Sequence, residues 1–268
     1  MATCSYQNSE ETSASFSFNY HRRFDVDTIN TTIVGGKIPK YSKINSVTAK
    51  MSAKRSGVNL STSNTDARIY FYNEADANDG VEVGWWENQI GTSYKEFSCD
   101  ITKYCISQAA NSGAISKSAI NNYSKLYFAS IGVTLRTHYI NLMGVYWDYT
   151  PPTYTLSLKT SGSGSVSGGG TFNVAVTDQT KTITATPSTG YKFVKWVDSK
   201  GNTYTTPSVN VTISQNNISA FSTTVTYTAY FELDKINKIY VGTAQPKAIY
   251  VGTQEVKAVY VGTTKVYG

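Results

Sequence analysis

The chain has 268 residues, enough for one to three domains, and its 21 Tyr and 10 Phe favour a strand-rich fold. Long Ala-, Leu-, Glu- and Lys-rich runs at helical spacing are absent, which excludes a mainly helical protein. The net charge of +6 divides as +1 in residues 1–150, +2 in 151–232 and +3 in 233–268, and a charge spread in this way argues against nucleic-acid binding.

Cysteine usage and the N-terminal residues indicate where the chain works. Cys4, Cys99 and Cys105 do not make a disulfide framework, so we expect thiols, with a Cys99–Cys105 pair left open. Residues 1–7 lack a basic-then-apolar stretch, so we expect no secretory signal, and no apolar run reaches membrane-spanning length. A virion component, released by lysis, fits these features. A mature exported fragment is the alternative, against which Met1 argues.

Residues 1–150 contain short runs in which apolar and polar side chains alternate, as in half-buried strands. Ile69 and Phe71 share one face of the run 68–72. The same alternation recurs at Ile131, Val133 and Leu135 and at Val145, Trp147 and Tyr149. Because two sheets must cover each other's apolar faces, the segment predicts a jelly-roll-like β-sandwich.

Two local signals lie between these runs. Asp79-Gly80 is typical of a hairpin turn. Asp100 is expected to cap one short helix within 100–105. The segment resembles the jelly-roll, carbohydrate-binding-like modules of phage tail proteins and extracellular enzymes, and the resemblance rests on residues 44–50, 97–102 and 148–152.

Pro151-Pro152 marks a stiff boundary, after which residues 153–232 resemble a divergent internalin-B-type bacterial repeat. The residues that carry the resemblance are 154–158, 162–166, 184–187, 190–196 and 227–232, in that order. It implies a small β-rich spacer or adhesion module of surface proteins, without catalytic residues. We expect Val194 and Trp196 to fill its core, and the glycines at 162–170 to permit a sharp hairpin.

Residues 233–268 contain a ten-residue repeat with the pattern Ile/Val-Tyr-Val-Gly-Thr, at 239–243, 249–253 and 259–263. Each apolar run predicts a strand and each Gly-Thr a turn, which together predict a β-meander with Ile249 and Val251 on one face and Tyr250 on the other. A hairpin this short is marginal alone, so we expect it to pack on a neighbour. Similar repeats terminate virion appendage proteins of phages that infect Gram-positive hosts.

Candidate catalytic and metal-binding residues do not form a recognisable motif. Acid–base catalysis needs two carboxylates poised across a substrate, and the sequence singles out no pair. His21 and His138 lie outside any nucleophile motif, so we expect surface or hydrogen-bonded roles. The carboxylates of the first segment are Asp66, Glu74, Asp76, Asp79, Glu82, Glu87, Asp100 and Asp148.

One stretch has calcium-like spacing. Glu74, Asp76 and Asn78 alternate ahead of Gly80, but an EF-hand loop needs Gly at its sixth position and Glu at its twelfth, and both requirements fail. We therefore expect a polar hairpin turn, with an irregular calcium site left open.

The adjacent pair Trp85-Trp86 is the sharpest local feature. Neighbours on a strand point to opposite faces, so Trp85 should join Val81 and Val83 in the core, and Trp86 should face outward with Glu82. An outward Trp packs well against a partner or a sugar ring. Trp86 is therefore a candidate ligand- or partner-binding residue, together with Tyr70 and Tyr72, which share a face; burial in a protein interface is the competing interpretation.

Together these features predict an all-β, modular protein with domains at 1–150, 153–232 and 233–268. We expect a non-enzymatic structural or adhesion protein on a bacteriophage virion, without cofactor, metal, nucleic acid or membrane as partner. A tail or baseplate appendage is preferred; a capsid decoration (head fibre) protein and a glycan-binding module of a bacterial surface protein are the alternatives. Other virion proteins, copies of itself (a trimer by analogy) and a host-surface glycan are its expected partners.

Overall fold

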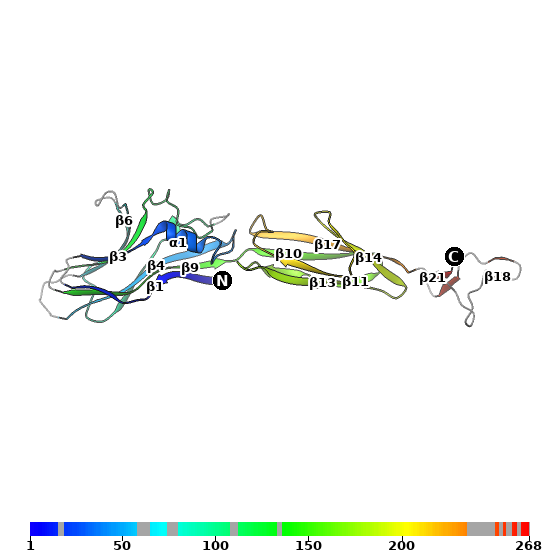
Figure 1. The fold of residues 1–268 in the computed structure, drawn as a ribbon, viewed down its shortest axis with the longest axis horizontal. Coiled ribbons are helices and arrows are strands. Elements are labelled where there is room, and N and C mark those ends of the chain that lie inside the picture. Colours follow the sequence, from blue (N-terminus) through cyan, green and yellow to red (C-terminus); the bar gives the residue numbers. More distant parts are fainter. Residues whose placement is uncertain are drawn as a thin grey trace. The chain divides into compact units, whose positions relative to one another are not determined.

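The computed structural model describes residues 1–15, 19–57, 65–73, 80–107, 112–132 and 136–234, and four short strands between residues 250 and 267. These residues form an almost entirely β structure built from antiparallel sheets, as the sequence predicts (Figure 1). The described residues contain no helix of the length and apolarity needed to cross a membrane.

The first compact unit holds two facing sheets. The first sheet has the order β1-β9-β4-β7, with β2 also paired to β9, and the second has the order β3-β8-β5-β6. The strands of the first are β1 (Ala2–Asn8), β2 (Thr12–Ser15), β4 (Lys43–Arg55), β7 (Lys95–Asp100) and β9 (Thr137–Thr150). Those of the second are β3 (Asn19–Asp25), β5 (Asp66–Tyr72), β6 (Gly80–Trp86) and β8 (Lys125–Ile131).

The chain crosses repeatedly between these sheets, so most strands that are neighbours in space are distant in sequence. Cys4 of β1 pairs with Trp147 of β9, and Tyr20 of β3 pairs with Ser130 of β8. Counting β1 and β2 as one position, eight strands divide into two four-stranded sheets in the interleaved order of a jelly roll. The predicted sandwich of jelly-roll type is confirmed.

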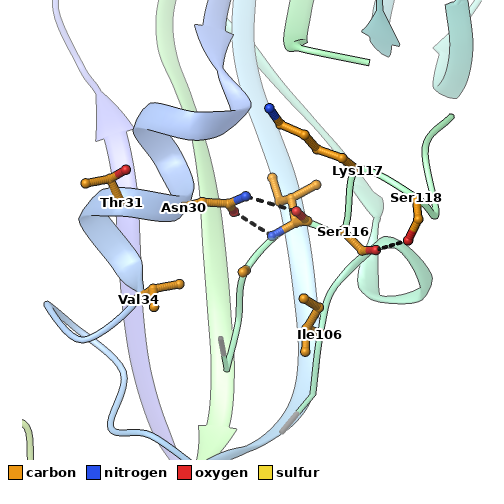
Figure 2. Close-up of a pocket in the computed structure, with 9 residues that line it drawn as sticks. Asn30, Thr31, Val34, Ile106, Ser116, Lys117 and Ser118 are labelled. Carbon is orange, nitrogen blue, oxygen red and sulfur yellow. Dashed lines mark hydrogen bonds between the residues drawn. The ribbon is translucent and has the colours of Figure 1, made fainter. Parts of the chain in front are cut away.

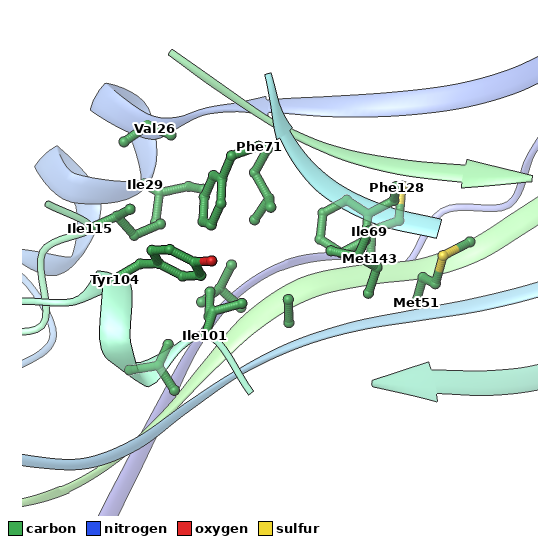
Figure 3. Close-up of a cluster of buried hydrophobic side chains, with 14 of the residues drawn as sticks. Val26, Ile29, Met51, Ile69, Phe71, Ile101, Tyr104, Ile115, Phe128 and Met143 are labelled. Atoms are coloured by element: carbon green, nitrogen blue, oxygen red, sulfur yellow. The ribbon is translucent and has the colours of Figure 1, made fainter. Parts of the chain in front are cut away.

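The core of this unit lies between the two sheets and beneath one helix (Figure 3). Alternation on β5 buries Ile69 and Phe71 completely, as predicted, and Val145 and Trp147 of β9 are equally inaccessible. The Phe71 and Tyr104 rings meet edge to face at 5.3 Å, close to Ile29 of the helix.

The helix α1 (Val26–Ile33) is a feature that the sequence analysis missed. Its buried residues are Val26, Ile29 and Ile33, at the three- and four-residue spacing of one helical face. The predicted short helix is present as the 3₁₀ helix η1 (Thr102–Tyr104), but its N-cap residue is Ile101 and not Asp100 as predicted. Asp100 accepts hydrogen bonds from the backbone N (2.8 Å) and Oγ1 (2.5 Å) of Thr102, which lower the pKa of its carboxyl.

The second unit also contains two antiparallel sheets, with orders β12-β10-β17-β14-β15 and β11-β13-β16. Trp196 is fully buried there, as predicted, and its Nε1 donates to the Pro207 carbonyl at 3.0 Å. The strands are β10 (Thr153–Ser161), β11 (Gly164–Ser167), β12 (Gly170–Asn173), β13 (Gln179–Pro187), β14 (Tyr191–Asp198), β15 (Thr203–Tyr204), β16 (Ser208–Ile213) and β17 (Ser222–Leu233).

The prediction that Val194 fills this core is wrong. Phe193 pairs with Phe231 and Lys195 with Tyr230, which leaves Val194 as the extra residue of a β-bulge. The bulge reverses the alternation, so Val194 is exposed while Phe193 and Trp196 lie with ring centroids 6.3 Å apart.

The C-terminal repeat forms short hairpins where it is described. The strand β18 (Tyr250–Val251) pairs with β19 (Gln254–Glu255), and β20 (Val259–Val261) pairs with β21 (Thr264–Tyr267). The second and third copies thus supply a strand followed by a return. The first copy, at 239–243, lies outside the described residues. The side chains of Ile249, Tyr250 and Val251 are not described either, so the faces predicted for them stay predictions.

Candidate functional site

The outer face of the β3-β8-β5-β6 sheet gathers aromatic and charged side chains from four strands in regular rows. One row contains Trp85, Arg68, Ala129 and His21, because Arg68 pairs with both Trp85 and Ala129, and Ala129 pairs with His21. The next row contains Glu82, Tyr70, Tyr127 and Arg23. This surface, hereafter the aromatic face, includes Tyr70 and Tyr72, two of the three predicted ligand-binding residues.

Trp85 stands at the β6 edge of the aromatic face and is 52% exposed. Its Nε1 donates to Asp66 Oδ2 at 3.0 Å, and the Arg68 guanidinium carbon lies 4.8 Å from its ring centroid. Asp66 is itself held by the backbone N–H of Asn88 at 2.9 Å. The indole is therefore fixed in orientation while much of its surface remains open to solvent.

Arg68 lies between two carboxylates. Its Nη2 is 3.4 Å from Asp66 Oδ2 and its Nη1 is 3.4 Å from Glu82 Oε2. The structure thus brings together Asp66 and Glu82, two carboxylates of the predicted set, on either side of a cation. The cation between them compensates part of their charge, unlike the open pair of carboxylates that glycoside hydrolysis uses.

Three tyrosines occupy the middle of the aromatic face. The Tyr70 ring stacks on Tyr127 at 5.3 Å with planes 19° apart, and Tyr72 meets Tyr127 at 5.0 Å. Burial, with the neighbouring Tyr127 and Tyr72, raises the pKa of Tyr70 to about 12. Tyr127 is nearly buried beneath this cluster, and His21 packs against it at 5.2 Å.

The prediction that Trp85 is core and Trp86 faces outward is wrong. Ile69 pairs with Gly84 while Tyr70 pairs with Glu82, so Val83 is the extra residue of a β-bulge. Beyond the bulge the two faces exchange. Trp86 therefore points inward, where it packs against the core with its ring centroid 5.4 Å from that of Phe97.

Sequence reasoning missed Trp85, Arg68 and Tyr127 as members of this face. Arg68 is the neighbour of the buried Ile69 on the strand, so alternation indicates that its side chain points outward. Tyr127 reaches the face only through the pairing of β5 with β8, which sequence spacing does not reveal. Gly84 was the one signal for Trp86, since a glycine beside a large ring on one strand often marks close approach.

The remaining predicted chemistry falls elsewhere. His138 is buried between the sheets, with Nδ1 2.6 Å from Ser130 Oγ, so it has the hydrogen-bonded role expected of it and no solvent access. Asp148 lies 3.4 Å from the Asn45 amide nitrogen. Two predictions fall at least partly outside the described residues. The residues with calcium-like spacing, Glu74, Asp76 and Asn78, are not described, and of the predicted Asp79-Gly80 turn only Gly80 is.

The three cysteines are free thiols, as expected. Burial raises the pKa of Cys4 to about 11 and those of Cys99 and Cys105 to about 12, with Lys37 lowering the first and Asp100 raising the other two. Thiols with such values carry little thiolate at neutral pH and are poor nucleophiles.

A pocket of about 510 Å³ lies between α1 and residues 114–118 (Figure 2). Asn30 exchanges two hydrogen bonds with the backbone of Ile115: its Nδ2 donates to the carbonyl at 2.9 Å and its Oδ1 accepts from the N–H at 2.6 Å. Lys117 Nζ lies 2.8 Å from Asp27 Oδ2. These groups fasten the 114–118 segment to the helix, which indicates a structural role.

Asp198 is a buried carboxylate of the second unit. Asp198 accepts hydrogen bonds from the backbone N–H groups of Lys200 (2.9 Å) and Asn202 (2.8 Å), from the Asn202 amide (2.9 Å) and from the Tyr204 hydroxyl (3.2 Å). Burial raises the pKa of Asp198, but these hydrogen bonds outweigh that effect and lower it. The carboxylate closes the turn between β14 and β15 and is a structural group.

The second unit also has a counterpart among known families. Residues 154–235 match the divergent InlB B-repeat domain. The match supports the predicted bacterial repeat, and the buried Trp196 and the paired strands β14 and β17 belong to it. No curated protein matches the chain.

Two solved structures show a distant likeness. One, described as Desmodium yellow mottle tymovirus, has 10% identity and a TM-score of 0.25, and the match covers 56% of this chain and 89% of that one. The other is the Spr0440 glycoside hydrolase domain, Endo-D, from Streptococcus pneumoniae R6, with 10% identity, a TM-score of 0.22, and coverage of 79% and 32%. TM-scores this low support no assignment of fold or function.

Proposed function

We propose that this chain is a non-enzymatic structural and adhesion protein of a bacteriophage virion, a tail or baseplate appendage that contributes to attachment at the host surface. In this role the jelly roll attaches or assembles within the particle, and the later modules project from it. Its partners are other virion proteins and further copies of itself, and a trimer is the assembly we propose by analogy.

The observation that carries the proposal is the interleaved strand order of the two N-terminal sheets, β1-β9-β4-β7 and β3-β8-β5-β6. Viral capsid and lectin domains are built on jelly rolls of this kind, in which two sheets leave broad outer faces free for contact. The fold alone does not determine function. Its fusion to a bacterial-type repeat and to Tyr-Val-Gly-Thr copies supports the proposal of a surface-exposed particle protein.

Two arrangements support a role without catalysis. Asp66 and Glu82 flank Arg68, so neither carboxylate is placed as an isolated acid or base across a cleft. Ser130 and His138 are within hydrogen-bonding distance, but both are buried between the sheets, where a substrate cannot reach them.

A capsid decoration protein is the second candidate, since capsid proteins themselves use jelly rolls. The match at residues 154–235 favours a third, a glycan-binding module of a bacterial surface protein. Antibodies against the recombinant chain distinguish the three when applied to gradient-purified particles and to cells that carry the gene. Gold label at the tail tip is the expected result. Label on heads favours capsid decoration, and label confined to the cell wall contradicts a virion role.

A further inference from the structure

The Trp85 ring is exposed to solvent and yet held in one orientation, and this combination suggests that it binds a ligand. Among the Trp, Tyr and Phe residues whose side chains are described, it has the highest exposed fraction, yet Asp66 and Arg68 hold its ring in place. A large apolar ring left in solvent contributes little to folding, whereas a ring held in one orientation loses little entropy on binding. The β-bulge at Val83 is what places this indole outside, with Trp86 inside.

Polar groups beside the ring offer both donors and acceptors. Arg68 and Glu82 are partly exposed, with 32% and 41% of their side chains accessible, and the 3.4 Å separation between them is long for a charged hydrogen bond. A ligand hydroxyl, which donates and accepts at once, can hydrogen-bond to the carboxylate and the guanidinium together. A flat apolar platform next to such a pair suits a sugar ring, which has C–H groups on one face and hydroxyls at its rim.

The charges of the aromatic face indicate which class of sugar fits. Arg68 is flanked by Asp66 and Glu82, and Lys125 Nζ lies 3.0 Å from Asp25 Oδ2. With Arg23, the described residues of the face carry three cations and three carboxylates. An anionic polymer, such as one bearing phosphates, needs a cationic surplus that these residues do not provide.

The number and spacing of the strands set the length of the aromatic face. Four strands spaced about 4.8 Å apart span roughly 14 Å from β6 to β3, the length of a short oligosaccharide. Tyr70 and Tyr72 extend the aromatic surface on the same strand as Arg68, with their ring centroids 6.2 Å apart.

We propose that the aromatic face binds a neutral saccharide, with the Trp85 indole as its stacking platform and the Arg68–Glu82 pair hydrogen-bonding to its hydroxyls. The inference rests on the proposed function in attachment and names the chemical class of the attachment ligand. It replaces Trp86 by Trp85 as the residue that contacts the ligand.

The test uses the full chain, coupled to beads for multivalent display, on an array of neutral oligosaccharides from Gram-positive cell surfaces, with poly(glycerol phosphate) as the anionic probe. Trp85→Ala should reduce binding to neutral glycans at least tenfold, and Trp85→Phe should retain most of it. The matched control is Tyr230→Ala, which removes another exposed ring with a cation above it, since Lys195 Nζ lies 5.5 Å from its centroid. This control should bind as the parent does.

Three results would overturn the inference: binding unchanged by Trp85→Ala, binding only to poly(glycerol phosphate), or no binding to any glycan of the array. Melting curves establish that each variant is folded. Incorporation of the Trp85→Ala chain into particles separates the two proposals. Normal incorporation leaves the virion role standing whatever the array shows, and lost incorporation without glycan binding identifies the face as an assembly interface.

Discussion

Replacing Gly84 by alanine tests the β-bulge that directs Trp85 outward and Trp86 inward. In the structure Gly84 lies on the inner face, opposite Ile69. A methyl group there would lie 2.5 Å from Cη2 and 2.9 Å from Cζ3 of Trp86, and 3.1 Å from Cβ of Cys99. The indole cannot move away freely because it packs against Phe97.

The expected cost follows from overpacking, which destabilises a core by about 1–3 kcal/mol. In a domain of this size each kcal/mol lowers the melting temperature by about 2–4 °C. Without the bulge, Gly84 would face solvent, and alanine would stabilise the strand by about 0.5–1 kcal/mol. The two registers therefore predict opposite signs for the same substitution.

Differential scanning calorimetry of the full chain measures this sign. The transition that contains the jelly roll should move down in Gly84→Ala, while the transition of the repeat domain stays in place. The matched control is Gly91→Ala, because a methyl group at Gly91 meets nothing within 4 Å. An unchanged or raised melting temperature for Gly84→Ala would refute the bulged register.

Three further outcomes are expected. Trp86→Ala should destabilise the jelly roll by about 3 kcal/mol in urea titrations, through loss of a large packed ring; a change below 0.5 kcal/mol would place that ring outside. Cys4, Cys99 and Cys105 should react with a thiol reagent slowly in the native chain and rapidly in urea, and fast labelling of any one in the native state would contradict its burial. Because the folded pKa of Asp198 lies below the ordinary 3.8, its charged form stabilises the repeat domain above that pH, and this contribution should fade as the pH falls through the folded pKa. The Asp198→Asn variant should lose about 1–3 kcal/mol at pH 7 and show a flatter acid dependence in thermal melts; a parent-like profile would count against the role of this carboxylate.

Alternation predicted the fold class and many of the buried faces. It placed Ile69 and Phe71 correctly because β5 contains no extra residue and pairs with β8 without a shift in register. It failed at Trp85, Trp86 and Val194 for one reason. A single extra residue in β6, and another in β14, exchanged the two faces of the strand, and strict alternation in the sequence does not reveal such an insertion.

Other features lay within reach of the sequence or beyond it. The spacing of Val26, Ile29 and Ile33 carries the helical signal of α1, which is short enough to be overlooked among strands. The aromatic face was beyond reach, because Tyr127 and Trp85 meet β5 only through register, and register is set by contacts across the whole sandwich.

Cryo-electron microscopy of particles with and without this gene tests the proposed virion role most directly. We expect the difference map to lose density at the tail tip or baseplate, and the lost density to accommodate the two facing sheets of the jelly roll. Identical maps from intact particles of both kinds would contradict a structural role in the virion.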